Sequence, residues 1–207
     1  MRAFLLLHNK KIRNKKQNRN KKICVVGVSP KSGVTHLCLC LANFLHSVMG
    51  RNVIYIELRR DSDLLNLVGL KQVRIGDITG YKYMGVKYVL TNDVNIVRNL
   101  MANEKAWIVV DMEDLNEETQ AVFMNSDNRI VIGSLSPWCQ KFYYQFIENN
   151  KLIINDTDRI NYLLTNKTKK LKDAFMHHIG SKPIDMPIIK DPFSLKEEDF
   201  EKIIEFL

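Results

Sequence analysis

The chain has 207 residues, of which 45% are hydrophobic and 26% charged, and its formal net charge is +8. This length and composition predict one globular domain with a substantial core and exclude a wholly disordered chain. No apolar run reaches the roughly 18–20 residues of a membrane span, and the apolar segment 3–7 is too short for a secretory signal, so we expect a cytoplasmic protein.

The excess positive charge lies at the N-terminus. Nine basic residues and no acidic residue fall within residues 1–22, whereas the rest of the chain has 22 basic and 23 acidic residues. We expect 1–22 to be a disordered basic tail and 23–207 to be the folded domain. Such a tail attracts anionic lipid at the inner face of the membrane, or nucleic acid through counterion release. A solvated extension without a partner is the alternative.

The folded domain is expected to begin with a strand, a polar loop and a helix. Residues 23–26 are an apolar strand, Gly27 opens a polar turn, and Gly33, Val34 and Thr35 start an apolar helix. This is the context of a P-loop, in which backbone N–H groups and a helix N-terminus hold phosphates. A P-loop ends in Gly-Lys-Thr, and here Val34 stands in the position of the lysine. The sequence therefore predicts the scaffold of a nucleotide site without its central cation.

Apolar runs and helical patterns alternate along the rest of the chain. Met84 and Gly85 join two short strands, 81–83 and 86–90, in a predicted hairpin. Ser136 and Pro137 are expected to start a helix that ends at 149, and Ser194 with Glu197 forms a capping-box pattern before the last helix. Further core strands are predicted at 52–58, 107–111, 129–137 (with its exit loop) and 151–155, and further helices at 61–68 and 94–102. This order predicts one α/β domain, doubly wound, with a mainly parallel sheet and a small antiparallel hairpin insertion.

The loop resembles that of the ParA/MinD family of deviant P-loop ATPases, which reads roughly K-G-G-x-G-K-T-T. On this pattern Gly33 and Thr35 match, Ser29 replaces the signature lysine, Val34 replaces the second lysine, and His36 replaces the last threonine. The predicted strands follow in the family's order over nearly the whole chain. The resemblance implies a P-loop NTPase fold of the ParA/MinD type.

The resemblance also implies roles for individual residues. Thr35 would place its hydroxyl on a magnesium ion, with Asp111 at the magnesium side of a Walker B strand and Glu57 at the position of a catalytic aspartate. The alternative is that Thr35 only caps the helix and Asp111 is only a polar strand end. Arg59 either pairs with Glu57 or lies near a phosphate. The implied nucleotide-binding residues are Gly27, Lys31, Ser32, Gly33, Val34, Thr35, His36, Asn155 and Pro187.

Two of these residues are implied at the nucleotide base. Asn155 ends the predicted strand 151–155, where the family's asparagine reads adenine, and Pro187 belongs to a proline-bearing segment near the base. Asn155 capping the next turn is the alternative. Separately, Trp138, Phe142 and Phe146 form one helical stripe that is expected to face the core, with a partner surface as the alternative.

The function implied by the resemblance is that of a nucleotide-binding regulatory, assembly or positioning protein. ATP or ADP with Mg²⁺ would be the cofactor, and a homodimer and a protein partner in a larger assembly are expected. Because Val34 cannot balance phosphate charge, we expect weak or no hydrolysis. The alternatives are a pseudo-ATPase interaction module that binds no nucleotide, and a DNA-associated partition-like protein that uses the basic tail.

Overall fold

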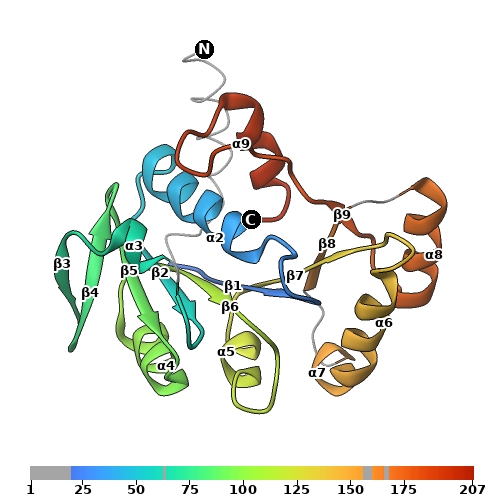
Figure 1. Ribbon diagram of the computed structural model, residues 1–207, viewed down its shortest axis with the longest axis horizontal. Helices are drawn as coiled ribbons and strands as arrows, with labels where there is room; N and C mark the ends of the chain where they lie inside the picture. Colours follow the sequence, from blue (N-terminus) through green and yellow to red (C-terminus); the bar gives the residue numbers. More distant parts are fainter. Residues whose placement is uncertain (1–19, 63, 156–159, 166–167) are drawn as a thin grey trace.

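The computed structural model describes residues 20–62, 64–155, 160–165 and 168–207. The strands of this part of the chain form one nine-stranded sheet in the order β3-β4-β5-β2-β6-β1-β7-β8-β9, with helices on both faces (Figure 1). The predicted doubly wound, mainly parallel α/β architecture is therefore confirmed.

The parallel part of the sheet places β1 at its centre, between β6 and β7. Its strands are β5 (Val86–Thr91), β2 (Val53–Leu58), β6 (Trp107–Met112), β1 (Lys22–Gly27), β7 (Asn128–Ser134), β8 (Ile160–Thr165) and β9 (Ile184–Asp185). All residues of β2 and β6 are buried. Covered on both faces, these strands consist of almost continuous apolar residues, which is why the sequence predicts them well.

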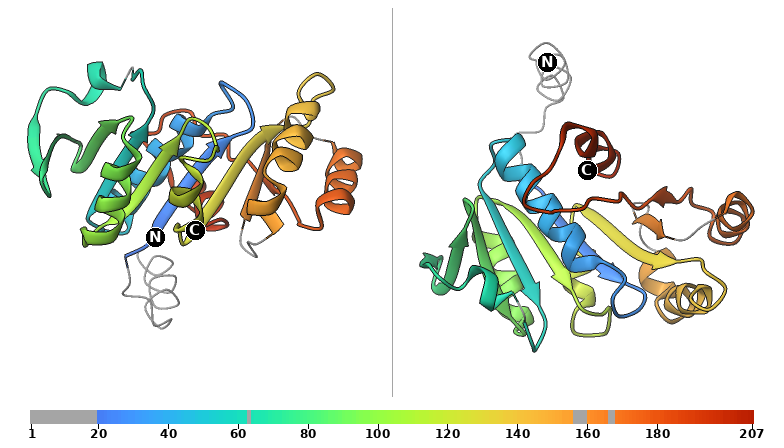
Figure 2. Two further views of the ribbon diagram at one scale, coloured as in Figure 1. Left: turned by 90° about the horizontal axis from the view of Figure 1, so that it is seen from below. Right: turned by 45° about the horizontal axis from the view of Figure 1, so that its top comes forward.

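Two layers of helices cover the sheet and divide the core into two clusters (Figures 1 and 2). One layer comprises α2 (Val34–Asn43), its π-helical continuation η1 (Phe44–Val48), α3 (Leu65–Val68) and α9 (Glu197–Ile204). The other comprises α4 (Val94–Asn103), α5 (Gln120–Met124), α6 (Gln140–Asn149), α7 (Lys151–Asn155) and α8 (Lys169–Ile179). No described helix is both long and apolar enough to cross a membrane.

The antiparallel insertion lies at one edge of the sheet. It consists of β3 (Gln72–Ile75) and β4 (Ile78–Tyr83), which pair with each other in antiparallel register. Met84 and Gly85 have φ values of 45° and 85°, the positive values that a tight hairpin turn requires, and join β4 to β5. The predicted hairpin is confirmed, but β5 also pairs in parallel with β2 and so belongs to the main sheet.

The strand predicted at 151–155 is wrong. These residues form the short helix α7, and the next strand is β8, which pairs in parallel with β7. A five-residue apolar run has the same appearance in a short strand and in one turn of helix, so periodicity could not separate them.

Three predicted boundaries also move. Lys22 already belongs to β1 and its N–H donates to Asp127 Oδ2 at 2.9 Å, so the folded part begins before residue 23. The helix expected from Pro137 begins at Gln140, after a turn. At the last helix, the carboxylate of Asp199, not of Glu197, accepts the backbone N–H of Lys196 at 3.0 Å. Residues 1–19 of the predicted tail lie outside the described part.

Candidate functional site

The carboxyl ends of the interior strands β1, β2 and β6 meet the N-terminus of α2. The carboxyl ends of parallel strands are the usual place for a ligand in open α/β folds. An open cleft of about 1470 Å³ lies there. Its walls are the loop 27–36, Arg59, the loop 112–117 and parts of α6 and α7. The predicted loop residues Gly27, Lys31, Ser32, Gly33, Val34, Thr35 and His36 all line this cleft.

The loop between β1 and α2 has the backbone of an anion site. Gly33 precedes α2 with φ 99°, a left-handed conformation that favours glycine. The N–H groups of Val34, Thr35 and His36 donate to no acceptor among the described residues. They point out of the start of a ten-residue helix, where the helix dipole favours negative charge.

The side chains of the loop place no positive charge at the position of the P-loop lysine. Val34 is 9% exposed and packs into the core cluster beneath α2. Lys31 is exposed, with a φ of 61°, at the rim of the cleft. At the start of the loop, a Cβ on Gly27 would overlap the hydroxyl of Ser32, so the loop folds closely over a glycine.

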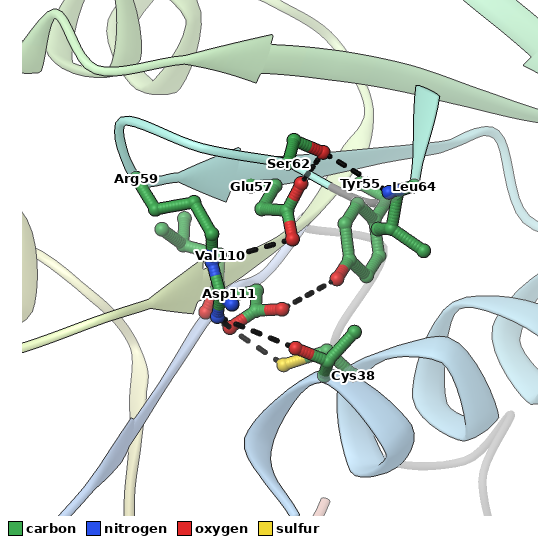
Figure 3. Close-up of polar contacts among 9 residues, drawn as sticks. Cys38, Tyr55, Glu57, Arg59, Ser62, Leu64, Val110 and Asp111 are labelled. Carbon is green, nitrogen blue, oxygen red and sulfur yellow. Dashed lines mark hydrogen bonds and ion pairs between the residues drawn. The ribbon is translucent and has the colours of Figure 1, made fainter. Parts of the chain in front are cut away.

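Arg59 is the cation that the structure places beside the helix N-terminus (Figure 3). Its Nη2 donates to Thr35 Oγ1 at 3.3 Å and to Asp111 Oδ1 at 3.2 Å, and its Nε lies 3.3 Å from Glu57 Oε1. Tyr55 donates to the other oxygen of Asp111 at 2.7 Å, and Ser62 donates to Glu57 Oε2. Arg59 therefore joins Thr35 and Asp111, the two residues implied at the metal, to Glu57, which is implied at a catalytic position.

Strand register explains why these groups meet. Glu57 and Asp111 are direct partners on the parallel strands β2 and β6, so they project from the same face. Tyr55 lies two residues before Glu57, on that face too. Glu57 and Asp111 are 2% and 0% exposed, and two buried carboxylates side by side require a positive partner.

The electrostatics of this cluster follow from burial and from the two carboxylates. Desolvation lowers the pKa of Arg59, but the charges of Asp111 and Glu57 outweigh it and the pKa is raised. Burial, with the Asp111 charge beside it, raises the pKa of the Tyr55 hydroxyl well above its usual value. Arg59 stays charged and Tyr55 stays a donor at neutral pH.

Several predictions can now be compared with these positions. The pairing of Arg59 with Glu57 is confirmed, whereas its contacts with Thr35 and Asp111 were missed. Thr35 does not cap α2, because that position is held by Gly33. His36 Nε2 lies 2.7 Å from the carbonyl oxygen of Ile189 and so fixes the C-terminal segment onto α2.

The implied base-binding residues are not among the residues that line the cleft. Asn155 lies on the helix α7 and not at a strand end, and its side chain lies outside what the structure describes. Pro187 is buried in the C-terminal segment. Its neighbour Met186 covers the loop, since a Cβ on Gly33 would lie 2.9 Å from Met186 Cε.

Comparisons with known proteins find the fold but no close relative. No family model matches the chain, and no curated protein matches its sequence. Solved structures do match. The septum site-determining protein MinD of Pyrococcus horikoshii, complexed with Mg-ADP, is 14% identical, with 74% of this chain and 76% of that chain covered and a TM-score of 0.55. The chain has a ParA/MinD-like fold.

Two further neighbours show how widely this ParA/MinD-like fold is used. A plasmid partition protein of Borrelia burgdorferi is 12% identical, with 91% of this chain and 97% of that chain covered and a TM-score of 0.60. The kinase domain of the Escherichia coli tyrosine kinase ETK is 16% identical, with coverages of 79% and 74% and a TM-score of 0.53. The fold alone therefore does not select a function, and the site must do so.

The aromatic stripe Trp138, Phe142 and Phe146 does not face the core as predicted. Trp138 is 74% exposed and Phe142 is 37% exposed, whereas Tyr143 is fully buried against Phe175. Phe146 is partly buried against the core. The stripe expected to face the core is thus wrong for Trp138 and Phe142, because Trp138 precedes α6 and α6 presents Tyr143 and Ile147 to the sheet.

Proposed function

We propose that the protein is a nucleotide-binding regulatory or positioning protein. The observation that carries this proposal is the run of unpaired N–H groups at the start of α2, in a cleft at the carboxyl ends of the parallel strands. A nucleoside di- or triphosphate is the ligand class that such a loop takes. The P. horikoshii neighbour supports it, since that structure is a complex with Mg-ADP.

Hydrolysis is proposed to be weak or absent. Val34 is packed into the core at the position where a P-loop lysine would balance the terminal phosphates. Losing one such electrostatic contact costs about 3 kcal/mol in a transition state. Phosphate release from ATP should therefore stay far below an ordinary enzymatic rate of about 1 s⁻¹. A faster rate that Thr35→Ala abolishes would contradict this.

The biological role is proposed from the neighbours' names. Septum-site determination and plasmid partition both position a large structure, and a role of that kind suits a chain with this fold. Of the residues implied at the metal and catalytic positions, Thr35 lines the cleft, whereas Glu57 and Asp111 are buried and hold Arg59 at its wall. A nucleotide placed there would act as a signal for a protein partner or a second copy of the chain.

Nucleotide binding can be tested with a matched pair of glycine variants. Gly33→Ala introduces a side chain at φ 99° into the loop and against Met186, so affinity for ADP and ATP should fall at least tenfold in calorimetry. Gly50→Ala introduces similar strain at φ 63°, at the other end of the same helical segment, where no atom lies within 4 Å of the new Cβ. It should leave affinity unchanged. Equal losses of nucleotide affinity in both variants would contradict the proposal that the loop before α2 binds the nucleotide.

A nucleotide-independent pseudo-ATPase module is the second candidate, and the charge of the cleft favours it. The acidic residues Glu113, Asp114, Glu117 and Glu148 line the cleft, against the basic residues Lys31, Arg59 and Lys151. Acidic walls repel a polyphosphate. Absence of ADP and ATP binding at millimolar concentration in the wild-type protein would select this candidate.

A further inference from the structure

We propose that Arg59 is a built-in cation that replaces a divalent metal, so that this site holds a phosphate-bearing ligand without Mg²⁺. A P-loop fold implies a magnesium ion beside the loop threonine and the Walker B aspartate. The residues present do not fit it, because the guanidinium group already lies between Thr35 and Asp111.

The geometry leaves no position for a metal. Mg²⁺ needs oxygen ligands at about 2.0–2.1 Å in octahedral arrangement. Nη2 of Arg59 lies within 3.3 Å of both Thr35 Oγ1 and Asp111 Oδ1, so an ion bound to these two oxygens would overlap the guanidinium (Figure 3). The other oxygen of Asp111 is also engaged, by the hydroxyl of Tyr55 at 2.7 Å.

One guanidinium contacts both buried carboxylates, and the hydroxyls of Tyr55 and Ser62 donate to their other oxygens. Asp111 and Glu57 are buried, and Arg59 contacts one oxygen of each at 3.2 and 3.3 Å. A dipositive ion placed next to the guanidinium would be repelled by it. Arg59 thus permanently offsets one of the two negative charges at the position where a metal would lie.

The same side chain reaches the cleft. The Arg59 side chain is 27% exposed and lines the cleft together with the loop. Its Nη1 donates to no described residue, so two N–H donors remain for an anion. A guanidinium group binds phosphate oxygens well. The ligand class is therefore a nucleoside phosphate without a bound metal ion. This ligand class rests on the proposed nucleotide-binding function, whereas the exclusion of the metal does not.

The metal arm of the test uses Mn²⁺ alone, monitored by electron paramagnetic resonance. The wild-type protein should bind no Mn²⁺ at this cluster at submillimolar concentration. Arg59→Met removes the charge and keeps an unbranched stem, so it should bind Mn²⁺ at least tenfold more tightly. Arg59→Lys keeps a cation and should behave as wild type. Arg60→Met removes the neighbouring, exposed arginine and is the matched control.

The nucleotide arm uses ADP in calorimetry, with Mg²⁺ or with a chelator. The wild-type affinity should agree within about twofold between the two conditions, and that of Arg59→Met should become dependent on Mg²⁺. Absence of ADP binding in both conditions would end the proposed function, while the Mn²⁺ arm would still decide the role of Arg59.

Equal Mn²⁺ binding by wild type and Arg59→Met, strong or absent, would overturn the proposal. If Arg59→Met does not fold, Arg59→Gln replaces it. Thermal melting of the wild-type protein decides if neither variant folds: 10 mM Mg²⁺ should leave Tm unchanged, and a rise of several degrees would overturn the exclusion of the metal.

Discussion

At the scale of single residues, Arg59 joins three parts of the chain through its contacts with Glu57, Thr35 and Asp111. The pair Glu57–Arg59 could be anticipated, because both residues lie at the end of one strand. The contacts of Arg59 with Thr35 and Asp111 join residues 24 and 52 positions apart. No local pattern encodes such contacts, since they depend on how α2 and β6 pack against β2.

The hydroxyl group of Tyr88 gives a prediction about stability. Tyr88 is fully buried against Tyr55, with ring centroids 5.2 Å apart, and its hydroxyl has no hydrogen-bond partner among the described residues. Tyr88→Phe removes this unsatisfied group and should raise the free energy of unfolding by about 1 kcal/mol, as measured by urea denaturation.

A matched tyrosine provides the control for that variant. Tyr143 is equally buried, but its hydroxyl donates to the carbonyl oxygen of Val131 at 3.0 Å. Tyr143→Phe should therefore lower the free energy of unfolding by about 1 kcal/mol. Loss of stability in both variants would mean that the Tyr88 hydroxyl is satisfied in solution.

The buried tyrosines also predict sensitivity to alkali. Burial raises the pKa of Tyr162 to about 12 and raises the pKa values of Tyr55 and Tyr143 well above 10. In the unfolded chain these tyrosines ionise near pH 10, whereas in the folded protein they stay protonated. Stability that is fully present below pH 10 should thus fall as the pH rises above 10. Urea midpoints that are level between pH 9 and 11.5 would contradict this.

At the scale of elements, burial on both faces made four core strands predictable and left the fifth ambiguous. The strands at 23–26, 52–58, 107–111 and 129–137 correspond to β1, β2, β6 and β7. The run 151–155 looks equally apolar, yet Leu152 is 89% exposed and only part of the segment faces the core. The true strand, β8, is interrupted by polar residues at its start and was missed.

The loop before α2 gives an element-scale prediction about affinity. Val34→Lys places an ammonium group at the helix start beside the unpaired N–H groups, so ATP should bind at least tenfold more tightly in calorimetry. Ser47→Lys adds the same charge at an exposed position near the end of the same helical segment and should change nothing. Equal affinity in wild type and Val34→Lys would contradict the placement of the phosphates beside position 34.

At the scale of the whole molecule, the alternation of apolar runs predicted the doubly wound sheet, but not how the C-terminal segment crosses it. Met186 lies over Gly33, and the carbonyl of Ile189 lies beside His36. These contacts join residues more than 150 positions apart. They hold the segment across the start of α2, whereas the family resemblance implies that Pro187 lies near a base.

The basic tail gives the whole-molecule prediction. Deleting residues 1–19 removes seven basic residues and leaves 24 basic and 23 acidic ones, while Lys21 and Lys22 keep their contacts with the domain. If the tail is an electrostatic tether, the full chain should sediment with anionic vesicles or bind duplex DNA at low salt. The truncated chain should not, and high salt should abolish the difference because exposed charges are screened within about 8 Å at physiological ionic strength.

The two surfaces then separate the proposals. A preference for vesicles would favour attachment to the inner face of the membrane, and a preference for DNA would favour the partition-like alternative. Full-length and truncated chains that behave alike on both surfaces would identify residues 1–19 as a solvated extension.

The direction of β1 has a consequence for how a tethered molecule would be oriented. Lys22 begins this central strand and Gly27 ends it at the cleft, so five steps of about 3.3 Å separate the two by roughly 16 Å. The first described residues lie beside the C-terminus, because Lys21 Nζ donates to the carbonyl oxygen of Leu207 at 3.0 Å. This contact is at the amino end of β1, on the opposite side of the molecule from the loop 27–36 (Figure 2). A surface that held the chain close to this attachment point would therefore face the amino end of β1, and the cleft would point away from that surface, toward an incoming partner.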